Sequence, residues 1–233
     1  MFETRIREGV LQAQAEAARW LATGWDGGYH DAPVAYNVSV PTGWDRTDLS
    51  AYAAERRQAA EFEPDGPTLL TGVDMTHAAG ARLDSIVAVA TVGLSNPATL
   101  PLSPDGTRPD GLVTDAPPAG TVNLIVGTDR ALDDGALATL LSVAVEAKTA
   151  TLQALAGVTG TTSDAVVVGT DPGGEPSSFA GSATPVGDAT RAAVRRAIVE
   201  SFQSRYGDEE PPATVAAADA GIETSRVATP FEP

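Results

Sequence analysis

The chain has 233 residues, which is enough for one sizeable domain with its own hydrophobic core. It contains no cysteine, which excludes disulfides, zinc–thiolate sites and cysteine nucleophiles. Its formal charge of −16 argues against a nucleic-acid partner, because a phosphate backbone is bound by a basic surface. No apolar run reaches the roughly 18 residues that a membrane span requires, and the charged N-terminus lacks the apolar core of a signal peptide, so we expect a soluble cytoplasmic protein without a membrane partner.

The first half of the chain mixes one predicted helix with several strands. Residues 4–21 are predicted to form a helix, because apolar residues recur there at helical spacing: Ile6, Val10, Ala13, Ala17 and Leu21. Alternating or β-branched runs then indicate strands at "VAYNVSV", "TLLTGVDM" and "SIVAVATVGL". Residues 43–66, between the first two, are predicted to form a polar loop and a short helix.

The second half begins with a proline- and glycine-rich segment over residues 95–120, from which no site residue is taken. The strand "TVNLIVGT" follows, and then a long helix over 133–156 that Asp133 or Asp134 caps and Gly157 ends. "DAVVVGT" and "FAGSATPV" are predicted strands, and a helix over 188–206 is expected to begin at Asp188 and end at Gly207.

These elements predict a single layered α/β or α+β domain over residues 1–206, in which the two later helices pack on a mixed sheet. The remaining residues, 207–233, are acidic and contain proline, so we expect a loosely docked tail.

Lys148 is the only lysine in a chain with fourteen arginines and thirty-one acidic residues. Such a surface resembles that of proteins adapted to high salt, where a Debye length of about 3 Å at about 1 M screens self-repulsion. Lys148 nevertheless lies at the centre of the apolar stripe of helix 133–156, which comprises Leu137, Leu140, Leu141, Ala144, Val145, Leu152 and Leu155. A lysine there needs a carboxylate, a ligand or a lowered pKa, and its retention suggests a role that arginine cannot fill.

Two polar segments flank this helix at strand ends. "TGTTSDAVVV" places Asp164 at the start of a strand, where it is the natural partner for Lys148, and the alternative role for that pair is a buried structural ion pair. "IVGTDRAL" places Thr128 and Asp129 at the end of a strand, which is where α/β sites usually lie.

The chain resembles the adenosylcobinamide amidohydrolase family of corrinoid-salvage enzymes in "ATGWDGG", "YNVSVP", "LLTGVDM", "ATVGLSNPA", "GTVNLIVGTDRALDDGAL", "EAKTATLQ", "TGTTSDAVVV" and "FAGSATPVG". The resemblance implies a hydrolase that cleaves the amide between aminopropanol and the corrin ring, giving adenosylcobyric acid for coenzyme B12 synthesis. The corrinoid is then the substrate, and no cofactor is expected. Such salvage is typical of archaea, in agreement with the salt-adapted composition.

Amide hydrolysis needs a nucleophile, donors for the oxyanion and a proton for the leaving amine. One arrangement uses the hydroxyl of Thr71 or Thr76, with Lys148 or His77 as the base. A variant of it follows from a fainter similarity to self-processing amidases of the aminopeptidase and ornithine-acetyltransferase type. In that variant the chain cuts itself before Thr71, which becomes an N-terminal nucleophile.

A second arrangement uses a water activated by Asp164 or Glu146, with Lys148 and Asn96 holding the oxyanion. The residues expected to meet in one cleft are Lys148, Asp164, Thr71, Asn96 and Thr128. A two-histidine metal site is a third possibility; its ligands would be His30, His77 and either Asp26 or Asp74. Their spacing matches no known signature, so no metal is expected.

A corrin ring calls for an open, partly aromatic groove, for which Trp25, Tyr29 and Trp44 are the candidates, while Tyr36 is expected in the core. Asp129 and Thr162 are predicted to add polar contacts to the substrate. The same groove would serve a non-catalytic corrinoid-binding or carrier protein, which is the alternative function. The sequence gives no indication of the oligomeric state.

Overall fold

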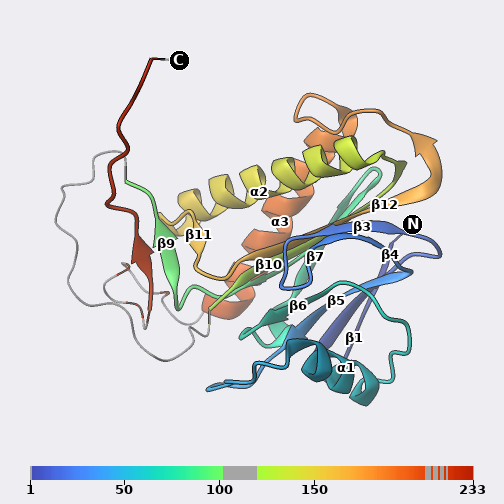
Figure 1. Cartoon of the computed structure of the whole chain (residues 1–233), viewed down its shortest axis with the longest axis horizontal. Helices are drawn as coiled ribbons and strands as arrows, with labels where there is room; N and C mark the ends of the chain where they lie inside the picture. The colour runs from blue at the N-terminus through green and yellow to red at the C-terminus, as the bar shows by residue number, and fades with distance from the viewer. Residues whose placement is uncertain are drawn as a thin grey trace.

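The structure is a computed structural model that describes residues 2–101, 120–207, 211, 215, 218 and 220–232. Figure 1 shows four layers: a pair of helices, a large sheet, a smaller sheet and a short helix. The predicted mixture of helices and strands in one layered domain is confirmed.

The large sheet has six strands in the order β4-β3-β12-β10-β8-β7. Its strands are β3 (Arg19–Ala22), β4 (Gly28–Asp31), β7 (Ala79–Leu83), β8 (Ile86–Val92), β10 (Val122–Ala131) and β12 (Ala165–Pro176). Only the central pair, β10 and β12, is parallel. Both faces of this sheet are buried, since Leu124 and Val126 of β10 pack under the helices while Ile125 packs against the smaller sheet.

Helices α2 (Asp134–Ala156) and α3 (Pro185–Tyr206) cover one face of the large sheet. The predicted ends of α2 are confirmed: the Asp133 side chain accepts a hydrogen bond from the backbone N–H of Ala136 at 2.7 Å, and Gly157 ends the helix with φ +69°. By length and composition, α2 is also the one helix of the described residues that could span a membrane. Half of its apolar window is buried against the sheet and α3, as in a core helix.

Helix α3 begins earlier than predicted. Thr184, not Asp188, caps it by accepting a hydrogen bond from the backbone N–H of Gly187 at 3.0 Å, and Pro185 takes the first helical position. The predicted strand over residues 179–186 is therefore wrong, because its last residues are the helix start.

The smaller sheet has four strands in the order β1-β2-β5-β6 and packs on the other face of the large sheet. Its strands are β1 (Glu3–Arg7), β2 (Val10–Gln14), β5 (Val34–Ser39) and β6 (Thr68–Thr71). The short helix α1 (Leu49–Ala59) covers its outer face, where Tyr52 packs near the fully buried Tyr36. A single 3-10 turn, η1 (Met75–His77), follows β6, and Asp74 caps it.

The predicted helix over residues 4–21 is wrong, since this segment forms β1, β2 and β3. Glu8 and Gly9 both have positive φ, at 46° and 71°, and they form the two-residue turn of a hairpin in which Arg7 pairs with Val10. Such a turn matches the twist of antiparallel strands, and the pairing with β5 then overrides the helical spacing of the apolar residues.

A third, three-stranded sheet has the order β11-β9-β13, with bounds of Gly160–Thr161, Pro97–Thr99 and Ile222–Glu223. It links one end of the irregular segment predicted over 95–120 to residues of the predicted tail. The interior of that segment, residues 102–119, and part of the tail lie outside the described residues.

Candidate active site

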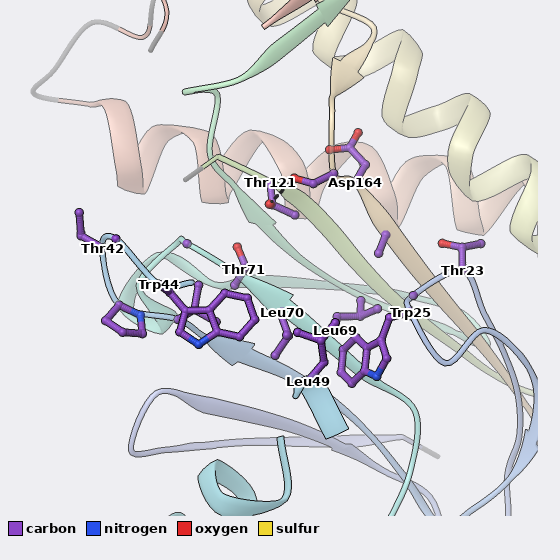
Figure 2. Close-up of a pocket in the computed structure, with 17 residues that line it drawn as sticks. Thr23, Trp25, Thr42, Trp44, Leu49, Leu69, Leu70, Thr71, Thr121 and Asp164 are labelled. Atoms are coloured by element: carbon purple, nitrogen blue, oxygen red, sulfur yellow. Dashed lines mark hydrogen bonds between the residues drawn. The ribbon is translucent and has the colours of Figure 1, made fainter. Parts of the chain in front are cut away.

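A cavity of about 420 Å³ lies where the end of β6 meets the N-terminal ends of β10 and β12. Trp25, Trp44 and Leu69 belong to its apolar wall, whereas Thr71, Thr121, Ser163 and Asp164 supply hydroxyl and carboxylate groups (Figure 2). Asp164 is the one ionisable side chain among the described residues that line the cavity. The volume lies within the roughly 300–1,000 Å³ that is usual for small-molecule sites.

Lys148 and Asp164 form a buried ion pair, as the sequence predicted. Lys148 is 6% exposed and projects from α2 toward the turn between β11 and β12. Asp164 accepts three further hydrogen bonds, from the backbone N–H groups of Val122 (2.9 Å) and Thr161 (3.1 Å) and from the Thr161 hydroxyl. The carboxylate thus joins α2, the start of β10 and the β11–β12 turn.

The residues just before Val122 and Asp164 carry hydroxyl groups into the cavity. Thr121 precedes Val122 and Ser163 precedes Asp164, and their Oγ atoms lie 2.9 Å apart. The ion pair therefore positions a hydroxyl pair that sequence reasoning did not select. The hydroxyl of Ser163 is visible in the motif "TGTTSDAVVV", but the sequence does not show that Thr121 lies beside this segment.

Gly160 leaves little room around the Lys148–Asp164 ion pair. A Cβ atom at Gly160 would lie 2.5 Å from Oδ2 of Asp164 and 3.0 Å from Nζ of Lys148, so β11 approaches the pair as closely as its atoms allow. A guanidinium is wider than an ammonium and donates through a planar fork. The space around the pair thus favours lysine over arginine.

We expect Gly160→Ala to lower the free energy of unfolding by about 1–3 kcal/mol, since the added methyl group must displace the Asp164 carboxylate. Thermal unfolding measures this change. Gly80→Ala is the matched control, because a Cβ atom there meets nothing closer than 3.6 Å. Equal melting temperatures for the two variants would contradict the tight packing at Gly160.

Asn96 is fully buried behind the hydroxyl pair. Its Nδ2 donates to the hydroxyls of Thr162 (2.6 Å) and Ser163 (3.3 Å), and its Oδ1 has no partner among the described residues. Asn96 and Thr162 therefore border the cavity through Ser163 but are absent from its lining.

Thr71 ends β6 and is 1% exposed. Its Oγ1 accepts a hydrogen bond from the backbone N–H of Val73 at 3.1 Å, and it donates to no acceptor among the described residues. Figure 2 shows its hydroxyl on the side that faces Thr121 and Asp164. The hydroxyl thus keeps its proton available for a partner in the cavity.

A buried amide network fixes β6 against β10. Asn123 of β10 donates through Nδ2 to the carbonyl of Leu70 (2.9 Å) and to Oδ1 of Asn37 (3.0 Å), and Asn37 donates to the Thr91 hydroxyl at 3.0 Å. These buried polar groups satisfy one another between the two sheets. The network holds the residue that precedes Thr71, and it was not anticipated from the sequence.

Thr128 and Asp129 do not join this cluster, which corrects the predicted meeting of all five residues in one cleft. The cavity lies at the N-terminal ends of β10 and β12, whereas Thr128 lies six residues along β10 from Val122, or about 20 Å at the rise of a strand. Thr128 is fully buried beside Ser85. The rule that placed the site at the opposite strand ends applies to open parallel sheets, and this sheet is mostly antiparallel.

Glu146 and Tyr29 also lie away from the cavity. Glu146 is on the outer side of α2, where it pairs with Arg191 of α3. Tyr29 stacks on Arg19, at 5.0 Å from its guanidinium carbon, and donates its hydroxyl to the carbonyl of Asp134 at 2.9 Å. The hydrogen bonds from Arg19 lower the pKa of the Asp134 carboxyl, so this group forms a surface ion-pair cluster at the start of α2.

The residues of the two-histidine metal site are far apart. His30 lies on β4 and His77 lies in η1, just before β7, and β4 and β7 are the two edges of the six-stranded sheet. The Asp74 carboxylate accepts hydrogen bonds from the backbone and side chain of Thr76, which lower its pKa. The described residues contain no cluster of three or more histidine or acidic side chains that could hold a metal ion.

The sequence profile of the family described as adenosylcobinamide amidohydrolase matches residues 2–210. A protein of Halobacterium salinarum named adenosylcobinamide amidohydrolase is 52% identical over 236 aligned residues, which cover 100% of both chains. A crystal structure from Pyrococcus horikoshii shares 12% identity with a TM-score of 0.45, covering 87% of this chain and 79% of that one, a likeness too weak to support an inference.

Proposed function

The chain belongs to the adenosylcobinamide amidohydrolase family, and on that premise we propose that it hydrolyses the amide that joins aminopropanol to the corrin ring of adenosylcobinamide. Water is added across the C–N bond, which yields the corrin carboxylate, adenosylcobyric acid, and free aminopropanol. The observation that carries the proposal is a cavity lined by residues of "LLTGVDM" and "TGTTSDAVVV", whose Asp164 pairs with Lys148 of "EAKTATLQ". The chain resembles the family in these three segments.

The shape of the cavity supports entry by one arm of the substrate. A corrin ring with its adenosyl group is much larger than a cavity of about 420 Å³, whereas the aminopropanol arm is small and carries the scissile amide. Trp25 is 38% exposed at the cavity, so its indole is available to the ring plane outside. Trp44 then packs against the arm together with the leucines of the wall.

The nucleophile in this proposal is the hydroxyl of Thr71. Its oxygen adds to the amide carbon, and the C–N bond breaks as the amine gains a proton. The oxyanion takes hydrogen bonds from the hydroxyls of Thr121 and Ser163, which turn to it from the Gly120 carbonyl that accepts them in the structure. Water then hydrolyses the resulting ester and regenerates Thr71. Asp164 is the one ionisable group that the described residues place at the cavity, so we assign proton transfer to it, with Lys148 fixing its position.

Incubation of the protein with adenosylcobinamide in concentrated KCl tests the proposed function. We expect free aminopropanol and adenosylcobyric acid in equal amounts, measured by mass spectrometry. A corrinoid that binds without release of aminopropanol would support the carrier alternative and contradict the enzyme. The intact mass of the same sample reports whether the chain has cut itself before Thr71.

The salt-adapted composition supports a cytoplasmic enzyme of a halophilic archaeon, as does the 52% identity to the Halobacterium salinarum protein. Activity that rises with KCl concentration would support this assignment, and greatest activity without added salt would contradict it.

A further inference from the structure

A second hollow of about 350 Å³ lies between α2 and α3, and its lining comes from those two helices alone. Most of its lining is apolar and small: Ala147, Ala150, Ala154, Leu155, Ala192 and Val199. Leu155 is 36% exposed, so an apolar helix surface is open to solvent here. None of these residues belongs to the candidate active site.

The charge of this groove differs from that of the rest of the chain. Its charged lining residues are one acid, Asp188, and two arginines, Arg191 and Arg195, while the chain as a whole carries −16. The exposed surface of α2 beyond its first turn has a single charge, Glu146, and Arg191 neutralises it. Charge repulsion between two copies of so acidic a chain is therefore weak across this face.

The two remaining charged residues of the groove, Asp188 and Arg195, are placed so that two copies of the chain can pair opposite charges across it. Asp188 and Arg195 lie seven residues apart on α3, which is about two turns or 10.5 Å along the helix on one face. Neither forms an ion pair within the described residues. A two-fold axis beside Ala192 would place α3 of two copies antiparallel, with Asp188 of each copy opposite Arg195 of the other.

We infer that the α2–α3 groove is the dimer interface of this protein and that its occupant is a second copy of the chain. The small side chains let the helices approach, Leu155 and Val199 supply apolar contact, and the Asp188–Arg195 pairs set the register. This inference rests on packing and charge and is independent of the proposed function.

Sedimentation equilibrium of the full chain in concentrated KCl tests the inference, with Arg195→Asp, Asp188→Arg and the double variant that exchanges the two charges. We expect a dimer for the wild type, about a tenfold or greater rise in the dimer dissociation constant for each single variant, and a return to within about threefold for the double variant. Arg196→Asp is the matched control, since Arg196 is exposed on the same helix, pairs with Glu200 and does not line the groove.

A monomeric wild type would overturn the inference, as would a dimer that neither single variant weakens or a double variant that fails to recover. An equal loss in Arg196→Asp would show a general charge effect and would also overturn it. Asp188 lies in the first turn of α3, where an acid is favourable, so the melting temperature of each variant is measured alongside. Recovery of dimerisation in the double variant excludes misfolding as the cause of the losses.

Discussion

Lys148→Met is expected to lower the free energy of unfolding by about 3–5 kcal/mol, because it leaves the Asp164 carboxylate buried without its cation. The side chains of the pair are only 7% and 11% exposed, so water compensates little for the loss. For a domain of this size the change corresponds to a melting temperature lower by roughly 10 °C. Methionine keeps the length and volume of the apolar stem, which separates the loss of charge from the loss of packing.

The same variant is expected to lose most amide hydrolysis even where it remains folded, because Asp164 then no longer fixes Thr121 and Ser163. Thermal unfolding and aminopropanol release measure the two effects on one sample. Glu200→Gln is the control for the loss of an exposed ion pair, and a change of about 1 kcal/mol or less is expected. A Lys148→Met protein as stable and as active as the wild type would contradict both the structural and the catalytic role.

The second large effect is expected for Thr71→Val, which keeps the volume of the side chain and removes the hydroxyl. If Thr71 is the nucleophile, the rate of amide hydrolysis falls by roughly 10³-fold or more, while Thr71→Ser retains most of it. The loss of the hydroxyl also leaves the backbone N–H of Val73 without its acceptor, so about 1–3 kcal/mol of stability is lost. Both variants are therefore assayed well below their melting temperatures.

Thr139→Ala is the matched control, since the one partner of its hydroxyl among the described residues is the carbonyl of Gly135, within α2 itself. Trapping of an ester on Thr71, seen by peptide mass after rapid quenching, separates a nucleophile from a residue that only shapes the cavity. Full activity in Thr71→Val would assign the attack to a water molecule instead.

The helix α2 and its ion pair could be predicted because all the information is local. Asp133 and Gly157 mark the ends of the helix, the apolar spacing places Lys148 on the buried face, and the one nearby acid that starts a strand is Asp164. The N-terminal hairpin could not be predicted in the same way. Its apolar residues fit a helix by spacing, and only the turn at Glu8 and Gly9 and the pairing with β5 decide against it.

The residues of the site could be predicted only where they lie in one local sequence motif. Asp164 could be found because it lies in the motif that follows the helix of Lys148. Thr121 and Asn123 reach the site through the pairing of β10 with β12, which no local sequence pattern indicates. Thr128 was misplaced because the sequence fixes neither the direction of neighbouring strands nor the end of the sheet at which a cavity opens.

The presence of one lysine in the whole chain has a practical consequence for observing the site. Protein grown with isotope-labelled lysine would give a single side-chain signal in an NMR spectrum, and that signal would come from the ion pair itself. An amine-reactive acylating reagent would meet a side-chain amine only when α2 opens, since Lys148 is 6% exposed in the folded chain. Its labelling rate therefore reports the opening of the α2 packing without any engineered probe.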